Sequence, residues 1–290
     1  MAKYGLSSMT VTSNLDRFMT LAVWSAALLV AAAFLWLLGD VLWHGAAHLS
    51  WSFLTEAPEN AGRSGGIGPI LVSTLMILAV AVAAAVPLGL ATAVWLTEFI
   101  RPGSRFGHLV GLSLDVLAGV PSIVLGLFGN AFFCVYLGLG FSILAGGLTL
   151  ACMVLPIFIR TAEAGLRAVP ADWRNGAAAL GLSRGAALIH ILLPAAAPAL
   201  AAALMLGIGR AMAETAALIY TSGYVDRMPS SLSDSGRALA VHIYDLSMNV
   251  AGGDPNAYAS ALVLITLLII INSTALWLAE NLLQRRIVTA

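Results

Sequence analysis

The sequence is poor in charged residues and contains a single lysine. Of its 290 residues, 10% are Asp, Glu, Lys or Arg and 60% are hydrophobic, whereas about a quarter of the residues of a soluble domain are charged. A chain of this composition cannot cover itself with a polar surface. Its one lysine, Lys3, belongs to no G-x-x-x-x-G-K-[ST] pattern, which excludes the phosphate-binding loop of an ATPase. Any energy from ATP must therefore arrive through another chain.

Cysteine is scarce, and the histidines are not clustered. Cys134 and Cys152 are the two cysteines and both fall in long apolar runs, so a structural disulfide is not indicated. The five histidines form no H-E-x-x-H or similar spacing of metal ligands, and we expect no metal site and no cofactor bound by this chain. The formal net charge of zero predicts no general attraction to nucleic acid.

Long uncharged runs dominate the sequence. About 20 apolar helical residues cross the hydrocarbon core of a membrane. The stretch 116–159 is long enough for two spans and is broken by the turn-like segment 138–142. The other expected spans lie at residues 18–42, 64–97, about 188–220 and 255–279. We therefore predict an all-α membrane protein with six transmembrane helices, built as a single domain over residues 1–290.

The distribution of basic residues predicts the orientation. With the amino terminus inside, ten of the 14 Lys and Arg residues lie in cytoplasmic segments, and Arg63, Arg227 and Arg237 lie outside. Positively charged loops stay on the cytoplasmic side. We expect a multi-pass protein of the bacterial inner membrane, surrounded by lipid, with both termini in the cytoplasm.

The cytoplasmic segment 161–189 is rich in alanine, and Pro170 and Gly181 divide it. This pattern predicts two short helices lying across the membrane face. The segment also contains the G-x-S-x-G pattern around Ser183, which in hydrolases exposes a nucleophilic serine. That site requires a preceding strand and a histidine base. An intramembrane serine hydrolase is the alternative from a different functional class.

The same segment carries a more specific pattern. Gly181 is separated by nine residues from Ile191, and Leu193 and Pro194 follow. This spacing resembles the loop of binding-protein-dependent ABC importer permeases, which docks on the ATPase subunit as a coupling helix. The family motif opens with Glu-Ala-Ala, and the matching positions here are Asn175, Gly176 and Ala177. The acidic residue is missing, and Asp172 or Glu163 are the candidates to replace it.

Further segments resemble the permeases of the phosphate-specific transport system. They are residues 65–69, 119–123, 126–128, 160–163 and 209–216, and the segment 242–262 is more similar to the A subunit than to the C subunit. The resemblance covers about 65–285. It implies a type I ABC importer permease fold with cytoplasmic coupling helices, and a transport subunit rather than an enzyme.

The same resemblance implies function and partners. The expected function is ATP-driven import of inorganic phosphate from the periplasm. The expected partners are a second permease, either a homologue or another copy of this chain, two copies of an ATPase that uses ATP and Mg, and a periplasmic phosphate-binding protein. Permeases for phosphonate, molybdate or sulfate are alternatives, because an arginine fork binds all of these oxyanions.

Two pairs of opposite charges fall in the expected spans. Arg210 and Glu214 are four residues apart and would share a helix face, and an arginine within a membrane is costly unless it is paired or faces water. Arg160 and Glu163 form a second pair nearer the cytoplasmic end. A guanidinium matches the oxygens of phosphate, so we expect both pairs to line the substrate pathway.

Each arginine also has a structural interpretation. Arg210 and Glu214 could form a static pair between helices, and Arg160 could be an ordinary cytoplasmic anchor. Asp115, near the start of the third span, is expected to be interfacial and inert.

Overall fold

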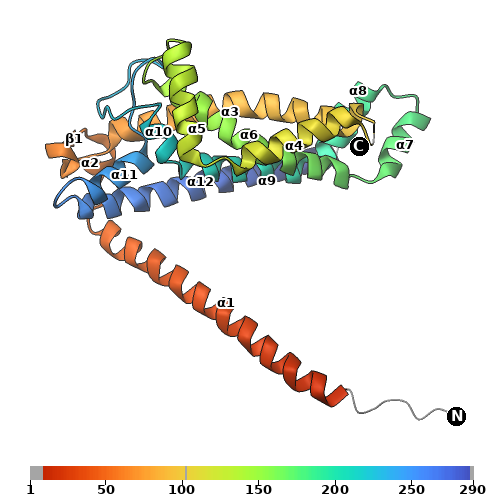
Figure 1. Ribbon diagram of the computed structural model, residues 1–290, viewed down its shortest axis with the longest axis horizontal. Coiled ribbons are helices and arrows are strands. Elements are labelled where there is room, and N and C mark those ends of the chain that lie inside the picture. The colour runs from red at the N-terminus through yellow and green to blue at the C-terminus, as the bar shows by residue number, and fades with distance from the viewer. Residues whose placement is uncertain (1–8, 102, 288–290) are drawn as a thin grey trace.

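A computed structural model describes the backbone of residues 9–101 and 103–287 and the side chains of residues 15–101 and 103–277. Most helices lie side by side in one elongated bundle, and the first helix leaves it at one end (Figure 1). The α-helices are α1 (Met9–Ala46), α2 (Trp51–Thr55), α3 (Gly68–Val94), α4 (Arg105–Gly119), α5 (Ser122–Gly129), α6 (Ile143–Ala168), α7 (Ala171–Ala179), α8 (Arg184–Ala187), α9 (Leu193–Met212), α10 (Ala216–Ile219), α11 (Leu239–Met248) and α12 (Asp254–Ile287).

Shorter elements complete the part of the chain that the structure describes. A 3-10 turn is η1 (Asn60–Gly62). The π-helical segments are η2 (Trp95–Phe99), η3 (Asn130–Tyr136) and η4 (Leu188–Leu192). Strands β1 (Pro58–Glu59) and β2 (Ser64–Gly65) form an antiparallel hairpin. The hairpin, α2 and α11 lie at one end of the bundle, called the α11 end, and α7 and α8 lie at the opposite end, called the α7 end (Figure 1).

Helices α3, α6 and α9 form the core of the bundle. Ile77 on α3, Leu150 on α6 and Ala203 on α9 are buried together. Where α3 crosses α6, a Cβ on Gly147 would lie only 2.5 Å from the side chain of Val80. Small residues at such crossings let helix backbones approach closely, which is the main way helices pack within a membrane.

The third span begins earlier than the uncharged stretch 116–159 predicts, and it is bent. Helix α4 meets the helix formed by α5 and η3 at an angle of 102°. Pro121 lacks an N–H and disfavours the helical conformation in Val120, whose φ and ψ are −69° and 128°. Within the described residues, five other helices are long and apolar enough to cross a membrane, so the total there is six when the bent pair counts as one span.

The fifth span also differs from the prediction. It runs from Arg184 to Met212 and stops well before residue 220. The chain is irregular around Glu214, and the short helix α10 begins at Ala216. A carboxylate oxygen of Glu214 accepts a hydrogen bond from the backbone N–H of Ala217 at 3.2 Å. This side chain therefore satisfies an N–H that has no partner within the helix.

Only one of the two short helices expected in the segment 161–189 is separate from the spans. Helix α6 continues to Ala168, so the beginning of the segment belongs to the fourth span. Helix α7 is the separate one and lies between Pro170 and Gly181, as these two breakers predict. Helix α8 is the first turn of the fifth span.

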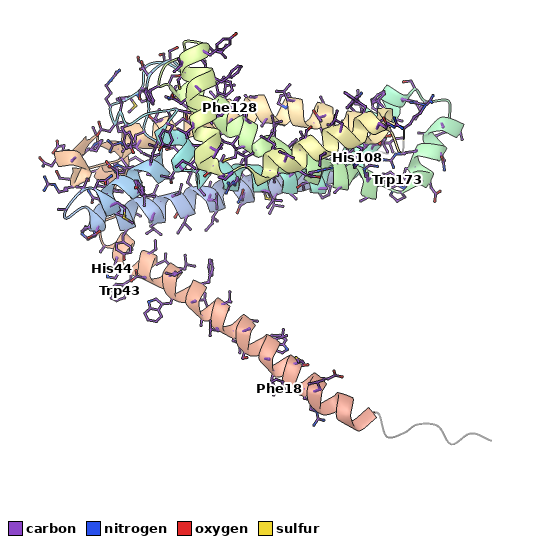
Figure 2. All side chains as sticks on the ribbon, viewed as in Figure 1. Phe18, Trp43, His44, His108, Phe128 and Trp173 are labelled. Atoms are coloured by element: carbon purple, nitrogen blue, oxygen red, sulfur yellow. The ribbon has the colours of Figure 1, made fainter. Side chains whose placement is uncertain are left out.

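Helix α1 stands apart from the bundle. Its apolar side chains, including Phe18 and Trp43, are exposed along the helix (Figure 2). The carboxyl end of α1 contacts α12, where the hydroxyl of Tyr258 donates to Asp40 at 3.0 Å. A Cβ on Gly45 of α1 would lie 2.7 Å from the carbonyl oxygen of Tyr258. A helix that is apolar on all sides is suited to lipid or to other membrane helices.

Candidate functional site

Arg210 lies in the last turn of α9 and is only loosely paired with Glu214. Its Nη2 is 3.9 Å from Oε2 of Glu214 and 3.9 Å from the sulfur of Met153 on α6. The side chain of Arg210 is 47% exposed, while that of Glu214 is 6% exposed. The structure thus brings the predicted pair together, but the helix ends between them, and the guanidinium remains accessible.

Arg160 on α6 makes more and shorter contacts than Arg210. Its Nη2 and Nε donate to Oδ1 of Asp115 at 2.6 and 3.1 Å, and Nη2 also donates to the carbonyl oxygen of Gly111 at 2.8 Å. Its Nη1 donates to Oε2 of Glu163 at 3.3 Å. The predicted pair with Glu163 is present, but the shortest contact is with Asp115. Asp115 is therefore not the inert residue that the sequence indicated, and the 45 residues that separate it from Arg160 leave no local pattern by which to find it.

Glu163 is shared between two arginines. Its Oε1 accepts from Nη2 and Nε of Arg167 at 2.9 and 3.1 Å, while its Oε2 faces Arg160. Its side chain is only 12% exposed. Two positive partners offset the cost of burying one carboxylate, so Glu163 is a fixed part of the site.

A hollow of about 710 Å³ opens beside this group at the α7 end. Its walls come from η2, from the segment after it, from the first turns of α4 and from the end of α6. The polar and charged residues that line it are Thr97, Glu98, Arg101, Ser104, His108, Arg160, Glu163 and Arg167. His108 lies toward the α7 end in Figure 2. Arg160 is thus reachable from this end through a space with a polar lining.

The two arginines occupy different levels of the bundle. Met153, which contacts Arg210, and Arg160 are seven residues apart on α6, or about 10 Å along the helix axis at 1.5 Å per residue. Arg210 is therefore further from the α7 end, as its sequence position predicts. The guanidinium of Arg210, which has few contacts, lies deeper, and that of Arg160, which has several, lies beside the hollow.

The residues that match the coupling pattern lie at the α7 end. Asn175 and Gly176 are exposed on α7, and Ala177 is buried. Gly181 ends the helix with a φ of +72°. The remaining three positions of the pattern, at the start of the fifth span, are Ile191, Leu193 and Pro194.

Two acidic residues were candidates to replace the glutamate that the coupling pattern lacks. Glu163 is held by two arginines, as described above, and so is not available to a partner. Asp172 is exposed in the first turn of α7. Asp172 is therefore the better candidate.

The surroundings of Ser183 do not fit a hydrolase. Its hydroxyl oxygen accepts from the backbone N–H of Ala186 at 3.2 Å and so caps α8. The element before it is helix α7, whereas the nucleophile turn requires a strand. Among the described side chains, no histidine or carboxylate bonds to this serine. The G-x-S-x-G match is a helix cap, and the hydrolase interpretation is wrong.

Comparison with known proteins agrees with this geometry. The pattern that defines the family "Binding-protein-dependent transport system inner membrane component" matches residues 85–288, well over half of the chain. The chain belongs to this family. It is therefore a multi-pass membrane protein and a subunit of a transport system.

Several relatives in this family resemble the chain over most of its length. It is 29% identical to "Probable ABC transporter permease protein YqgI" of Bacillus subtilis, over 89% of this chain and 93% of the relative. It is 33% identical to "Phosphate transport system permease protein PstA 1" of Mycobacterium tuberculosis, over 87% and 84%. It is 32% identical to "Phosphate transport system permease protein PstA 2" of Mycobacterium bovis, over 74% and 72%.

Solved structures confirm the fold. A bacterial ABC transporter involved in the import of alginate aligns with a TM-score of 0.63 at 12% identity, over 93% of this chain and 98% of that one. The inward-facing MetNI methionine ABC transporter aligns with a TM-score of 0.58 at 18% identity, over 74% and 96%. The predicted type I ABC importer permease fold is confirmed.

Proposed function

We propose that this chain is a permease subunit through which an ATP-driven importer moves inorganic phosphate into the cytoplasm. The observation that carries the proposal is the state of Arg210. Its guanidinium is half exposed within a membrane span, and Glu214, the carboxylate paired with it among the described side chains, is 3.9 Å away. An arginine within a membrane marks a functional site by default. The relatives that are named as phosphate transport permeases support the same anion.

The chemistry of the pair suits a transient site. A guanidinium offers donors in a planar fork that fits two phosphate oxygens, and such charge-assisted bonds strengthen in a low dielectric. Conduction also requires that the ion can leave. Glu214, buried beside Arg210, offsets part of the positive charge. Phosphate would therefore be held at Arg210 but not trapped.

The proposed orientation places the α7 end in the cytoplasm. Arg167, Arg174 and Arg184 lie at this end, and positively charged segments stay inside. Two copies of an ATPase would dock on α7, hydrolyse ATP with Mg, and move this end. A periplasmic phosphate-binding protein would deliver the anion at the α11 end, and a second permease would complete the channel.

Uptake by reconstituted vesicles tests the proposal. The chain with its second permease and ATPase, supplied with ATP on the ATPase side and binding protein on the other, should take up radiolabelled phosphate. Arg210→Lys should lower the rate about tenfold or more, since a bond from a charged donor contributes about 1.5–3 kcal/mol. Arg17→Lys, at an exposed position on α1, is the matched control and should be neutral.

Competition identifies the anion. Unlabelled phosphate should suppress the uptake at concentrations where sulfate, molybdate and phosphonate do not. If one of these other oxyanions competed better than phosphate, that anion would be the substrate of the Arg210 guanidinium, and the assignment of phosphate would be wrong. Full phosphate uptake by Arg210→Lys would exclude the fork as the binding group.

A further inference from the structure

The donors of Arg160 are almost fully used by the protein itself. A guanidinium has five N–H donors, and four of them are committed to Asp115, Gly111 and Glu163. Asp115 accepts from Nε and Nη2 of Arg160. These two groups form one of the edges of the guanidinium through which arginine binds two oxygens of an anion. Phosphate can reach this edge only after the carboxylate has left it.

The two carboxylates that contact Arg160 differ in how firmly they are held. Glu163 is on the same helix as Arg160 and is shared with Arg167. Asp115 is on another helix, α4, and its side chain is 63% exposed. An exposed ion pair contributes little to stability, with a median of about 0–1 kcal/mol. Asp115 is thus the partner that can be exchanged at small cost.

The fold also allows these two contacts to separate. Arg160 and Glu163 move together because α6 carries both. Asp115 lies four residues before the end of α4, next to the 102° bend at Pro121. A rotation of α4 about this bend would withdraw Asp115 and leave the pair with Glu163 intact. The hollow reaches Arg160 from the α7 end, and its lining does not include Asp115.

We propose that Asp115 is a displaceable counterion that occupies the phosphate-binding edge of Arg160 between transport events. The inference rests on the proposed function, because it requires phosphate to pass Arg160. A phosphate that arrives from Arg210 exchanges with the carboxylate of Asp115 and then leaves through the hollow. When the carboxylate returns, it competes with the anion and speeds its release. It also keeps cytoplasmic phosphate from occupying Arg160. Asp115 is in this sense a positioning residue that sets the affinity of the exit site.

The test uses Asp115→Asn in the complete reconstituted importer. The amide keeps the size of the side chain and removes its charge. Both the KM for phosphate uptake and the maximal rate should fall about two- to fivefold, the range expected when an exposed ion pair is lost. Phosphate enclosed on the ATPase side should inhibit the variant more strongly than the wild type. Asp115→Glu keeps the charge and should restore most of the rate.

Asp16→Asn is the control, since Asp16 is exposed on α1, which stands apart from the bundle and from the proposed pathway. It should leave both constants unchanged. A lower rate of Asp115→Asn with an unchanged or raised KM would indicate a structural role and overturn the proposal. Wild-type kinetics in this variant would overturn it as well, while the proposed function would stand. Wild-type vesicles that take up no phosphate would overturn both.

Discussion

Arg174 on α7 forms a salt bridge with Glu98 at the end of the second span. Its Nη2 donates to Oε1 of Glu98 at 2.8 Å, and its Nε lies 3.2 and 3.3 Å from the two carboxylate oxygens. The same guanidinium donates to the carbonyl oxygens of Leu166 and Val169 at 2.8 and 2.7 Å. One side chain on α7 therefore joins the ends of α6 and of the α3–η2 span, and a displacement of α7 would be passed to both.

Removal of this link should separate ATP hydrolysis from transport. Arg174→Gln leaves Glu98 without its partner, and the loss of bonds to a charged group costs about 1.5–3 kcal/mol. We expect the ATPase rate to persist while the phosphate taken up per ATP falls several-fold. Arg17→Gln, which changes an exposed arginine on α1, away from the α7 end of the bundle, is the control. An unchanged ratio of uptake to hydrolysis in Arg174→Gln would contradict the coupling role.

The sequence predicted those features that depend on local composition. Uncharged runs located the spans. Pro170 and Gly181 delimited α7, because proline cannot continue a preceding helix and glycine readily takes the left-handed conformation that ends one. It could not predict that Asp115 meets Arg160, since that contact depends on how α4 packs against α6. The sequence also did not predict that the fifth span ends before Glu214. The Glu214 carboxylate accepts a hydrogen bond from the backbone N–H of Ala217, and a side-chain bond of this kind competes with the hydrogen bonds of a continuous helix.

Gly181 offers a test of how α7 ends. Its φ of +72° is in the left-handed region, and the N–H groups of Gly181 and Leu182 donate to the carbonyl oxygens of Ala178 and Ala177 at 3.0 Å each. A Cβ in this conformation costs about 1–2 kcal/mol. Gly181→Ala should lower the stability by about 1 kcal/mol, measured as a reduced Tm in detergent.

Gly176→Ala is the matched control for this change. Gly176 lies inside α7, and a Cβ there would have no heavy atom within 4 Å. Alanine is favoured over glycine in a helix interior by about 1 kcal/mol, so the Tm of this variant should be equal to the wild type or higher. Equal Tm values for Gly181→Ala and Gly176→Ala would show that the left-handed turn does not limit stability.

The crossing of α3 and α6 should tolerate no added methyl group at Gly147. A Cβ there would lie 2.5 Å from Val80 and 3.0 Å from the carbonyl oxygen of Ile77. Because one of these neighbours is backbone, the helices would have to separate, and overpacking typically costs 1–3 kcal/mol. Gly147→Ala should lower the Tm, and Val80→Ala should recover part of the loss in the double variant. Additive effects of the two substitutions would argue against this contact.

His242, on α11 and outside the membrane-spanning helices, predicts a dependence of stability on pH. The imidazole is buried, and burial together with the nearby Arg237 lowers the pKa of His242 from 6.5 to about 4, although Asp245 acts in the opposite direction. Nη1 of Arg237 lies 3.5 Å from Nδ1 of His242 and 3.4 Å from Oδ2 of Asp245. The folded protein therefore holds a neutral ring that faces a cation.

The unfolded chain binds the proton more tightly than the folded one, so it takes up more protons between about pH 4 and 6.5. Stability should be fully retained above pH 6.5 and should fall by up to about 3 kcal/mol as the pH decreases to about 4. His242→Gln has no ring to protonate, so its Tm should change less over this window, and the exposed His48→Gln should behave like the wild type. Parallel Tm profiles for wild type and His242→Gln would mean that the buried ring does not control the acid sensitivity of the α11 end.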